Sequence, residues 1–300
     1  MWMKTLHMTD ENPEVTRYAR MLLKHANISD QLPTPVDEIV TCANLVVSQD
    51  ITLSEKHTDF FTRSLGILKS ALEKVIGMVD LREDVIYLDT TLLPQKRTFI
   101  KLHETGHKVL PWQRQTYLYL DDETTLAPDV HEHFEREANC FAADVLFQID
   151  RFDQDAHDLP LAIKSPLTLS KRYGASAHAA IRRYVERSKH ACAVLIIERL
   201  PELGTEGPLL RIKKVIQSTK FVHKFEEVKW PTLINMDWPF TELILRRCRF
   251  FEDGEIVLND RESNPIRCQF HIFDNSYNVF VFIYPFTEQV RHSKKIIVVR

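Results

Sequence analysis

Hydrophobic positions recur at helical spacing through the first part of the chain. Within residues 13–78, apolar side chains return every three or four positions, as in Val15, Tyr18, Met21 and Leu22, and again in Phe60, Phe61, Leu65, Leu68 and Leu72. This period places them along one face of a helix. The pattern predicts that the N-terminal part of the chain, within residues 13–78, forms helices.

The hydrophobic period then changes. Apolar and β-branched residues at 75–79 and at 85–88 flank the polar stretch Arg82-Glu83-Asp84, a pattern typical of a small antiparallel hairpin. Helical spacing returns from about Leu92 to Leu110, and Pro111 is expected to end that helix. The sequence predicts a strand hairpin followed directly by a helix.

Three further helices are predicted before residue 190. The first runs from about Val130 to Phe147 and follows the start signal Pro128-Asp129. Two shorter helices, Leu167–Tyr173 and Ala177–Arg187, are each preceded by a serine that is typical of a helix N-terminus.

The last third of the chain has a β-like pattern. Runs rich in β-branched and aromatic residues, separated by Asn, Asp, Ser and Pro, indicate a mostly antiparallel sheet: GEIVLND, IRCQFHIF, NVFVFIY and KIIVVR. Residues 200–209, LPELGTEGPL, hold two of the seven glycines and two prolines, which predicts a linker. We expect an α+β protein with a mainly helical, zincin-like domain and small antiparallel sheet over residues 1–199, followed by a β-rich domain over 200–300.

Composition restricts the class of protein. The 300 residues are 44% apolar, which is enough to form a hydrophobic core. The formal charge is -3, so the chain as a whole does not attract nucleic acid or an anionic membrane. The five cysteines are widely spaced without a CxxC pair, which argues against a disulfide framework. No apolar run is long enough to span a bilayer. We expect a cytoplasmic protein without a membrane partner.

The helix that ends near Leu110 carries an HExxH motif, His103-Glu104-Thr105-Gly106-His107. Residues four apart lie only about 40° apart around a helix, so both imidazoles project from one face and can bind one ion. Glu104 is offset by about 100°, beside the ion, where a general base for an attacking water is needed. A chance HExxH on a surface helix is the alternative. The apolar surroundings, the small Gly106 and the carboxylate-rich helix that follows favour a metal site.

A catalytic zinc ion requires a third protein ligand and an open position. The next helix, with the sequence HEHFEREAN from residue 131, offers several groups, and spacing alone does not choose among them. Glu135 and Asn139 share a face, so if Glu135 binds the metal, Asn139 can hydrogen-bond a ligating histidine. Glu137 points about 200° away from Glu135 and is expected to face solvent or pair with a basic neighbour.

The two motifs HETGHKVL and EREANCFAADVLF, preceded by the hairpin, resemble the ImmA/IrrE family of zinc metallopeptidases, also called M78 peptidases. The resemblance covers roughly residues 35 to 190 and continues in LSKRYGASAHAAIRRYV. It implies His103, His107 and Glu135 as zinc ligands and Glu104 as the general base. Two departures are Phe147-Gln148, where the family often has Met-Pro, and the insert LPWQRQTYLYLDDETTLAPDVHEH.

The resemblance also implies a biological role. Family members typically cleave helix-turn-helix repressors of phage, mobile-element, stress or antiviral-defence genes, and related proteins carry a C-terminal sensory domain that is GAF-like in some members. We expect a zinc-dependent endopeptidase that cleaves such a repressor and is gated by residues 200–300, with single-stranded DNA or a small molecule as activator. The alternative is a DNA-binding or ligand-sensing regulator with a structural or degenerate metal site.

Weaker signals remain open. Residues 165–188 have the pattern of a helix-turn-helix in which Arg182 and Arg183 read DNA, although a helical pair closing the peptidase core is favoured. Cys140 is a conceivable inhibitory thiolate, but it lies about 140° from Glu135 on the helix and is better interpreted as a small hydrophobe.

Two other sets of residues are candidates for roles in binding or catalysis. His131, His133, Tyr117 and Tyr119 are candidate donors to the oxyanion of the tetrahedral intermediate. Residues 246–251, RRCRFF, mix cations with aromatic rings as platforms for single-stranded nucleic acid do. A strand with a solvated edge explains that segment equally well.

Overall fold

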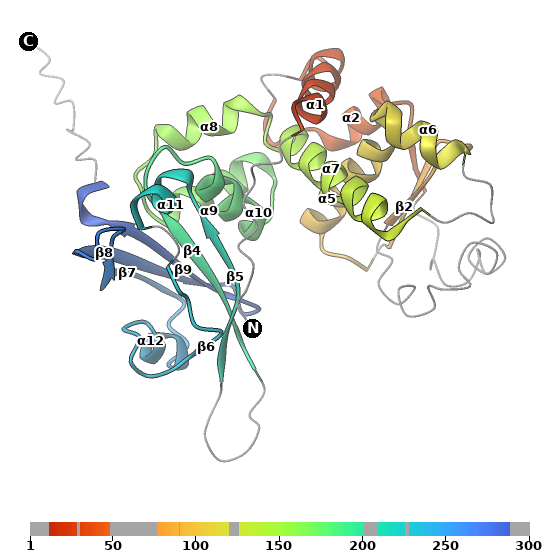
Figure 1. Ribbon diagram of the computed structural model, residues 1–300. Helices are drawn as coiled ribbons and strands as arrows, with labels where there is room; N and C mark the ends of the chain where they lie inside the picture. The colour runs from red at the N-terminus through yellow and green to blue at the C-terminus, as the bar shows by residue number, and fades with distance from the viewer. Residues whose placement is uncertain are drawn as a thin grey trace, which may run out of the picture. The chain divides into compact units, whose positions relative to one another are not determined.

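The computed structural model describes residues 12–28, 31–48, 77–89, 91–119, 126–200, 209–225 and 228–288. It divides into two compact units (Figure 1). Of the described residues, we call those in 12–152 together with Lys171–Ser176 the helical unit, and those in 153–170 and 177–288 the sheet unit. The predicted helix around Phe60–Leu72 and the run KIIVVR lie outside the described residues.

The helical unit is built from helices and one small sheet. Its helices are α1 (Pro13–His25), α2 (Val36–Cys42), α5 (Pro94–Val109), α6 (Pro111–Tyr119) and α7 (Pro128–Leu146), while α8 (Asp150–His157) and α9 (Lys164–Tyr173) contribute residues to both units. The strands β1 (Val46–Ser48), β2 (Gly77–Asp80) and β3 (Val85–Leu88) form a sheet in the order β1-β3-β2. The predicted hairpin of β2 and β3 is confirmed, and β1 adds a parallel partner to β3.

Local sequence explains where these helices begin and end. The side chain of Asn12 accepts a hydrogen bond from the backbone N–H of Glu14 at 3.1 Å, which caps α1 one residue before Pro13. Prolines also open α5, α6 and α7 at their first helical position. Pro111 therefore ends α5, as predicted, and at the same time begins α6, which the pattern had not indicated.

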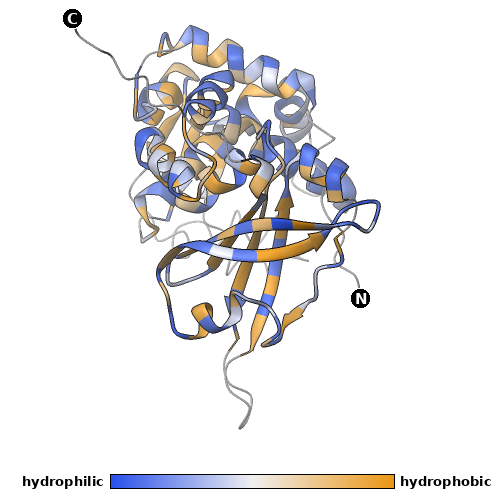
Figure 2. Cartoon of the chain, turned by 90° about the vertical axis from the view of Figure 1, so that its left-hand side faces the viewer, coloured by the Kyte–Doolittle hydropathy of each residue, from blue (hydrophilic) through white to orange (hydrophobic). Residues whose placement is uncertain are grey.

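The sheet unit contains a six-stranded antiparallel sheet. Its strands are β4 (Ala193–Arg199), β5 (Leu210–Gln217), β6 (Leu233–Ile234), β7 (Phe250–Asn259), β8 (Pro265–Asp274) and β9 (Val279–Pro285), in the order β6-β5-β4-β9-β8-β7. The strands carry long hydrophobic stretches (Figure 2), and the helix α10 (Ala177–Glu186) packs against β4 and β5. Shorter helical segments complete the unit: α11 (Thr219–Phe225), α12 (Thr241–Leu245) and η2 (Phe286–Glu288).

The compact units differ from the predicted division at residue 200. Strand β4 pairs with β5 from Ala193 opposite Gln217 to Arg199 opposite Leu210, so residues 200–209 join two neighbouring strands of one sheet. The first five residues of β4 are buried, and a buried strand requires hydrogen-bonded neighbours on both sides. The sheet unit therefore includes β4 and extends back through α10.

Within the described residues, no helix combines the length and the apolar character that crossing a membrane requires.

Candidate metal centre

The two long helices α5 and α7 pack side by side in the helical unit (Figure 1). The two helices approach closely at Gly106, where a Cβ atom would lie 3.2 Å from Cδ1 of Phe141 and 3.4 Å from Cα of Ala138. A larger residue at this position would push the helices apart. The glycine inside the HExxH motif therefore lets α7 approach the two histidines of α5.

This packing brings His103, His107 and Glu135 together. The Nε2 atoms of the two histidines are 3.2 Å apart, and they lie 3.2 Å and 3.4 Å from the carboxylate oxygens of Glu135. Two ligands that are each about 2.0–2.1 Å from a tetrahedral zinc ion are about 3.3 Å from one another. The three groups thus have the chemistry and the spacing of one face of a tetrahedral zinc site.

The other ring nitrogen of each histidine faces an amide oxygen. Nδ1 of His103 is 3.2 Å from Oδ1 of Asn139, the partner predicted from the helical face that Asn139 shares with Glu135. Nδ1 of His107 is 2.7 Å from Oε1 of Gln113, a residue of α6 that is completely buried. The sequence analysis missed Gln113, because no period or motif links an insert residue to the HExxH helix.

Glu137 does not face solvent as the helical angle predicted. Its side chain is 5% exposed and accepts hydrogen bonds from Asn12 at 2.7 Å, from Trp112 at 2.6 Å and from Gln113 at 2.8 Å. The predicted basic partner is present as well, since Nε2 of His133 lies 3.3 Å from its carboxylate. Glu137 is buried because α6 and the N-terminal cap of α1 cover the face of α7 that carries it.

Glu104 lies beside the three clustered groups in a buried position. Burial raises the pKa of its carboxyl, and the charges of His107 and His103 and the backbone N–H of Val79 oppose this effect without cancelling it. The result is a carboxylate that binds a proton more readily than one in water. This is the property that a general base requires near neutral pH.

The charges of the cluster favour a deprotonated Glu135. Burial raises the pKa of this carboxyl, but hydrogen bonds and charges from His103 and His107 lower it further, to well below its ordinary value. Burial alone would lower the pKa of His107. Its hydrogen bond to Glu135 and the charges of Glu104 and Glu135 more than reverse that effect, so the pKa of His107 is raised. The three groups attract one positive charge, carried by a proton or by a metal cation.

Among the candidate oxyanion donors, Tyr117 packs against a histidine of the cluster. Its ring packs edge-on against His107 with 5.5 Å between ring centroids. Burial, followed by the charges of Glu135 and Glu104, raises the pKa of its hydroxyl, which keeps it protonated. By contrast, Tyr119 is 87% exposed, and His133 pairs with Glu137. His131 lies at the exposed rim, 4.0 Å from Glu135.

The structure does not support the binding roles considered for Cys140, for Arg183 or for the RRCRFF segment. Cys140 does not belong to the group of His103, His107 and Glu135. Arg183 is buried in the sheet unit, 3.9 Å from Asp153, and α10 packs on β4 and β5, which differs both from a DNA-reading helix and from a helix closing the peptidase core. In the RRCRFF segment, Lys164 lies over the ring of Phe250 and Phe251 packs against the core, so these rings are not a stacking platform.

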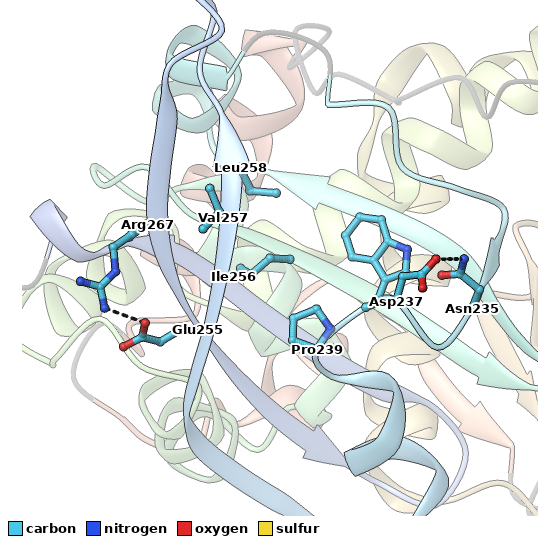
Figure 3. Close-up of a pocket in the computed structure, with 9 residues that line it drawn as sticks. Asn235, Asp237, Pro239, Glu255, Ile256, Val257, Leu258 and Arg267 are labelled. Carbon is cyan, nitrogen blue, oxygen red and sulfur yellow. Dashed lines mark hydrogen bonds and ion pairs between the residues drawn. The ribbon is translucent and has the colours of Figure 1, made fainter.

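The sheet unit has a hollow of about 550 Å³ between the β6–α12 connection and strand β7 (Figure 3). Its lining is mixed in character: Asn235, Asp237, Trp238, Pro239, Glu255, Ile256, Val257, Leu258 and Arg267. Asn235 donates a hydrogen bond to Asp237 at 2.6 Å, and Arg267 pairs with Glu255 at 2.7 Å. The volume is in the range of small-molecule sites.

Comparisons with known proteins give a family match for part of the chain and a likeness in fold. Residues 59–184 match the sequence model of the Peptidase_M78 family, described as the IrrE N-terminal-like domain. Among solved structures, a Mycobacterium tuberculosis transcriptional regulator superposes with a TM-score of 0.56 at 11% identity, covering 93% of this chain and 92% of that chain. This likeness concerns the fold alone. A search of curated proteins found no match.

Proposed function

We propose that the protein is a zinc-dependent endopeptidase, because residues 59–184 match the sequence model of the M78 peptidase family, the IrrE N-terminal-like domain. The observation that carries the proposal is the cluster of His103, His107 and Glu135 at the spacing of a tetrahedral zinc site, with the buried Glu104 beside it. Two imidazoles and one carboxylate are a ligand set of catalytic rather than structural zinc sites.

In this proposal His103, His107 and Glu135 hold the zinc ion. Bound zinc supplies Lewis acidity, which polarises a peptide carbonyl and lowers the pKa of a water molecule toward about 7. Asn139 and Gln113 orient the two histidines through their Nδ1 atoms.

Glu104 moves the proton in the reaction. Its carboxylate takes a proton from the water that attacks the scissile carbonyl and later gives it to the leaving amide nitrogen. The raised pKa of Glu104 supports both steps, because a base with an ordinary carboxyl pKa would bind that proton too weakly. Tyr117 donates a hydrogen bond to the oxyanion, a role supported by its position against His107 and its protonated hydroxyl.

We propose a helix-turn-helix transcriptional repressor as the substrate, controlling stress, phage or antiviral-defence genes. The support is the match of residues 59–184 to the family, together with a solved neighbour that is named a transcriptional regulator. For gating by the C-terminal region, the hollow beside β7 favours a small-molecule activator over single-stranded DNA. The aromatic residues of the RRCRFF segment are engaged elsewhere.

The test is cleavage of helix-turn-helix repressors encoded beside the gene, using the purified full chain with zinc and the Glu104→Gln variant. Wild type is expected to cut at least one of them, and the variant is expected to lose at least about 10²-fold in rate, since general-base catalysis contributes about 10²–10⁴-fold. Glu132→Gln on the exposed face of α7 is the charge-matched control. Equal cleavage by wild type and Glu104→Gln would refute the assigned mechanism.

A further inference from the structure

The completely buried Gln113 connects the candidate metal centre to a second carboxylate. It projects from α6, and its amide contacts three groups: the ring of His107, the backbone carbonyl of Phe134 and the carboxylate of Glu137. Neither the HExxH motif nor the sequence pattern of α7 predicts any of these contacts.

The contacts allow only one orientation of this amide. The Gln113 nitrogen donates to the carbonyl oxygen of Phe134 at 3.1 Å and to Glu137 at 2.8 Å. A carbonyl and a carboxylate only accept hydrogen bonds, so neither tolerates the amide oxygen in that place. The oxygen of Gln113 must therefore face His107, where it lies 2.7 Å from Nδ1.

This orientation fixes the protonation pattern of the His107 ring. An amide oxygen only accepts, so Nδ1 of His107 must carry the hydrogen that Gln113 receives. In the neutral ring, Nε2 then has its lone pair free. Nε2 is the atom that faces His103 and Glu135, so the lone pair is directed to the place where a metal ion would bind.

Glu137 is itself held in place. Trp112 donates its indole N–H to one carboxylate oxygen at 2.6 Å, and Asn12 donates to the other at 2.7 Å. These donors come from α6 and from the cap of α1, so Glu137 is anchored independently of the two histidines. A fixed chain of hydrogen bonds leads from Glu137 through Gln113 to His107.

We propose that Gln113, oriented by Glu137, is a positioning residue that holds His107 in its metal-ligating tautomer. The proposal rests on the proposed function only in requiring that His107 bind a metal. It gives a role to the α6 insert, which the resemblance to the family left unexplained, and to Glu137, whose buried charge is otherwise costly.

The first test measures zinc affinity by chelator competition on the full chain. Gln113→Met keeps the length of the side chain and removes its acceptor, whereas Gln115→Met makes the same change at an exposed position of α6. Gln113→Met is expected to weaken zinc binding by about 10–100-fold and to alter the ligand-field absorption of bound Co²⁺, with Gln115→Met like wild type.

The outcomes separate the two proposals. Failure of the wild type to bind zinc would overturn the proposed function, while tight binding by wild type and by Gln113→Met alike would overturn only the role of Gln113. If Gln113→Met does not fold, the ¹⁵N NMR shifts of the His107 ring in metal-free wild type decide. At a pH above the pKa of His107 we expect the proton on Nδ1, and a proton on Nε2 instead would contradict the proposal.

Discussion

At the scale of single residues, the candidate centre depends on orientation as much as on the presence of ligands. Both histidines have one nitrogen in the cluster and the other against an amide oxygen, from Asn139 and from Gln113. Amide acceptors are neutral, so they orient the rings without adding charge to a site that already holds Glu104 and Glu135. The pKa of Glu104 therefore depends mainly on its burial and on the two histidines.

The residue-scale prediction concerns Tyr117. Replacing it with phenylalanine removes the hydroxyl and keeps the ring that packs on His107. If this hydroxyl stabilises the oxyanion, Tyr117→Phe is expected to lower kcat by about 10²–10³-fold with little change in KM, because the interaction forms only in the transition state. Steady-state kinetics on a cleaved repressor measures this, with the exposed Tyr119→Phe as control. An unchanged kcat in Tyr117→Phe would assign the oxyanion to another donor.

At the scale of elements, the helices α5 and α7 together supply the residues of the candidate centre. Helix α5 supplies both histidines and the base, α7 supplies the carboxylate, and α6 and the cap of α1 contact the far side of α7 through Glu137. Lys108 forms an ion pair with Asp84 in the β2–β3 turn, which joins α5 to the hairpin. We expect the spacing of α5 and α7 at Gly106 to affect how closely Glu135 approaches the histidines.

The element-scale prediction is that Gly106→Ala weakens metal binding more than it weakens the fold. Better helix propensity contributes about 1 kcal/mol, which offsets part of an overpacking cost of about 1–3 kcal/mol against Phe141. The net loss in the free energy of unfolding is expected to be small. Zinc affinity is expected to fall, because the side chain of Phe141 must give way by a few tenths of an ångström and α7, which carries both Phe141 and Glu135, is expected to shift with it.

Chelator competition and chemical denaturation on the same samples test this prediction. The exposed Gln95→Ala on α5 serves as the control for adding an alanine to this helix. Wild-type zinc affinity in Gly106→Ala would show that the close approach at this glycine is not what positions Glu135.

At the scale of the whole molecule, the chain combines two compact units with different cores. The helical unit holds the candidate metal centre, and the sheet unit buries its own hydrophobic cluster from β4, β5, β7, β8 and β9. A ligand that binds only the native state stabilises the part of the structure that it holds together. Zinc is therefore expected to act on one unit far more than on the other.

The whole-molecule prediction is that removal of metal from the full chain increases hydrogen exchange in α5 and α7 and leaves β4 and β9 nearly unchanged. At a zinc concentration about 1,000 times Kd, the stabilisation lost on chelation is about 4 kcal/mol. Exchange mass spectrometry with and without chelator resolves peptides from these elements. A matching increase throughout the sheet would show that the two units unfold as one.

The sequence by itself determined the local features of this protein. The helical period, the prolines and the N-terminal serines predicted α5, α7, α9 and α10 to within a few residues, and the apolar residues around Arg82-Glu83-Asp84 predicted the β2–β3 hairpin. The HExxH spacing predicted two imidazoles on one face, the family resemblance implied Glu135 as the third ligand, and the helical angle predicted that Asn139 shares a face with it. These features depend on residues close together in one chain segment, where period and spacing alone decide geometry.

Only the tertiary structure determined which side chains and strands from distant segments contact each other. Gln113 reaches His107 from a different helix, Glu137 is buried by Trp112 and Asn12, and β4 belongs to the sheet that follows residues 200–209. Contacts between segments far apart in the chain leave no periodic trace in either segment. They arise because packing must satisfy buried polar groups and pair buried strands, a condition set by the whole fold.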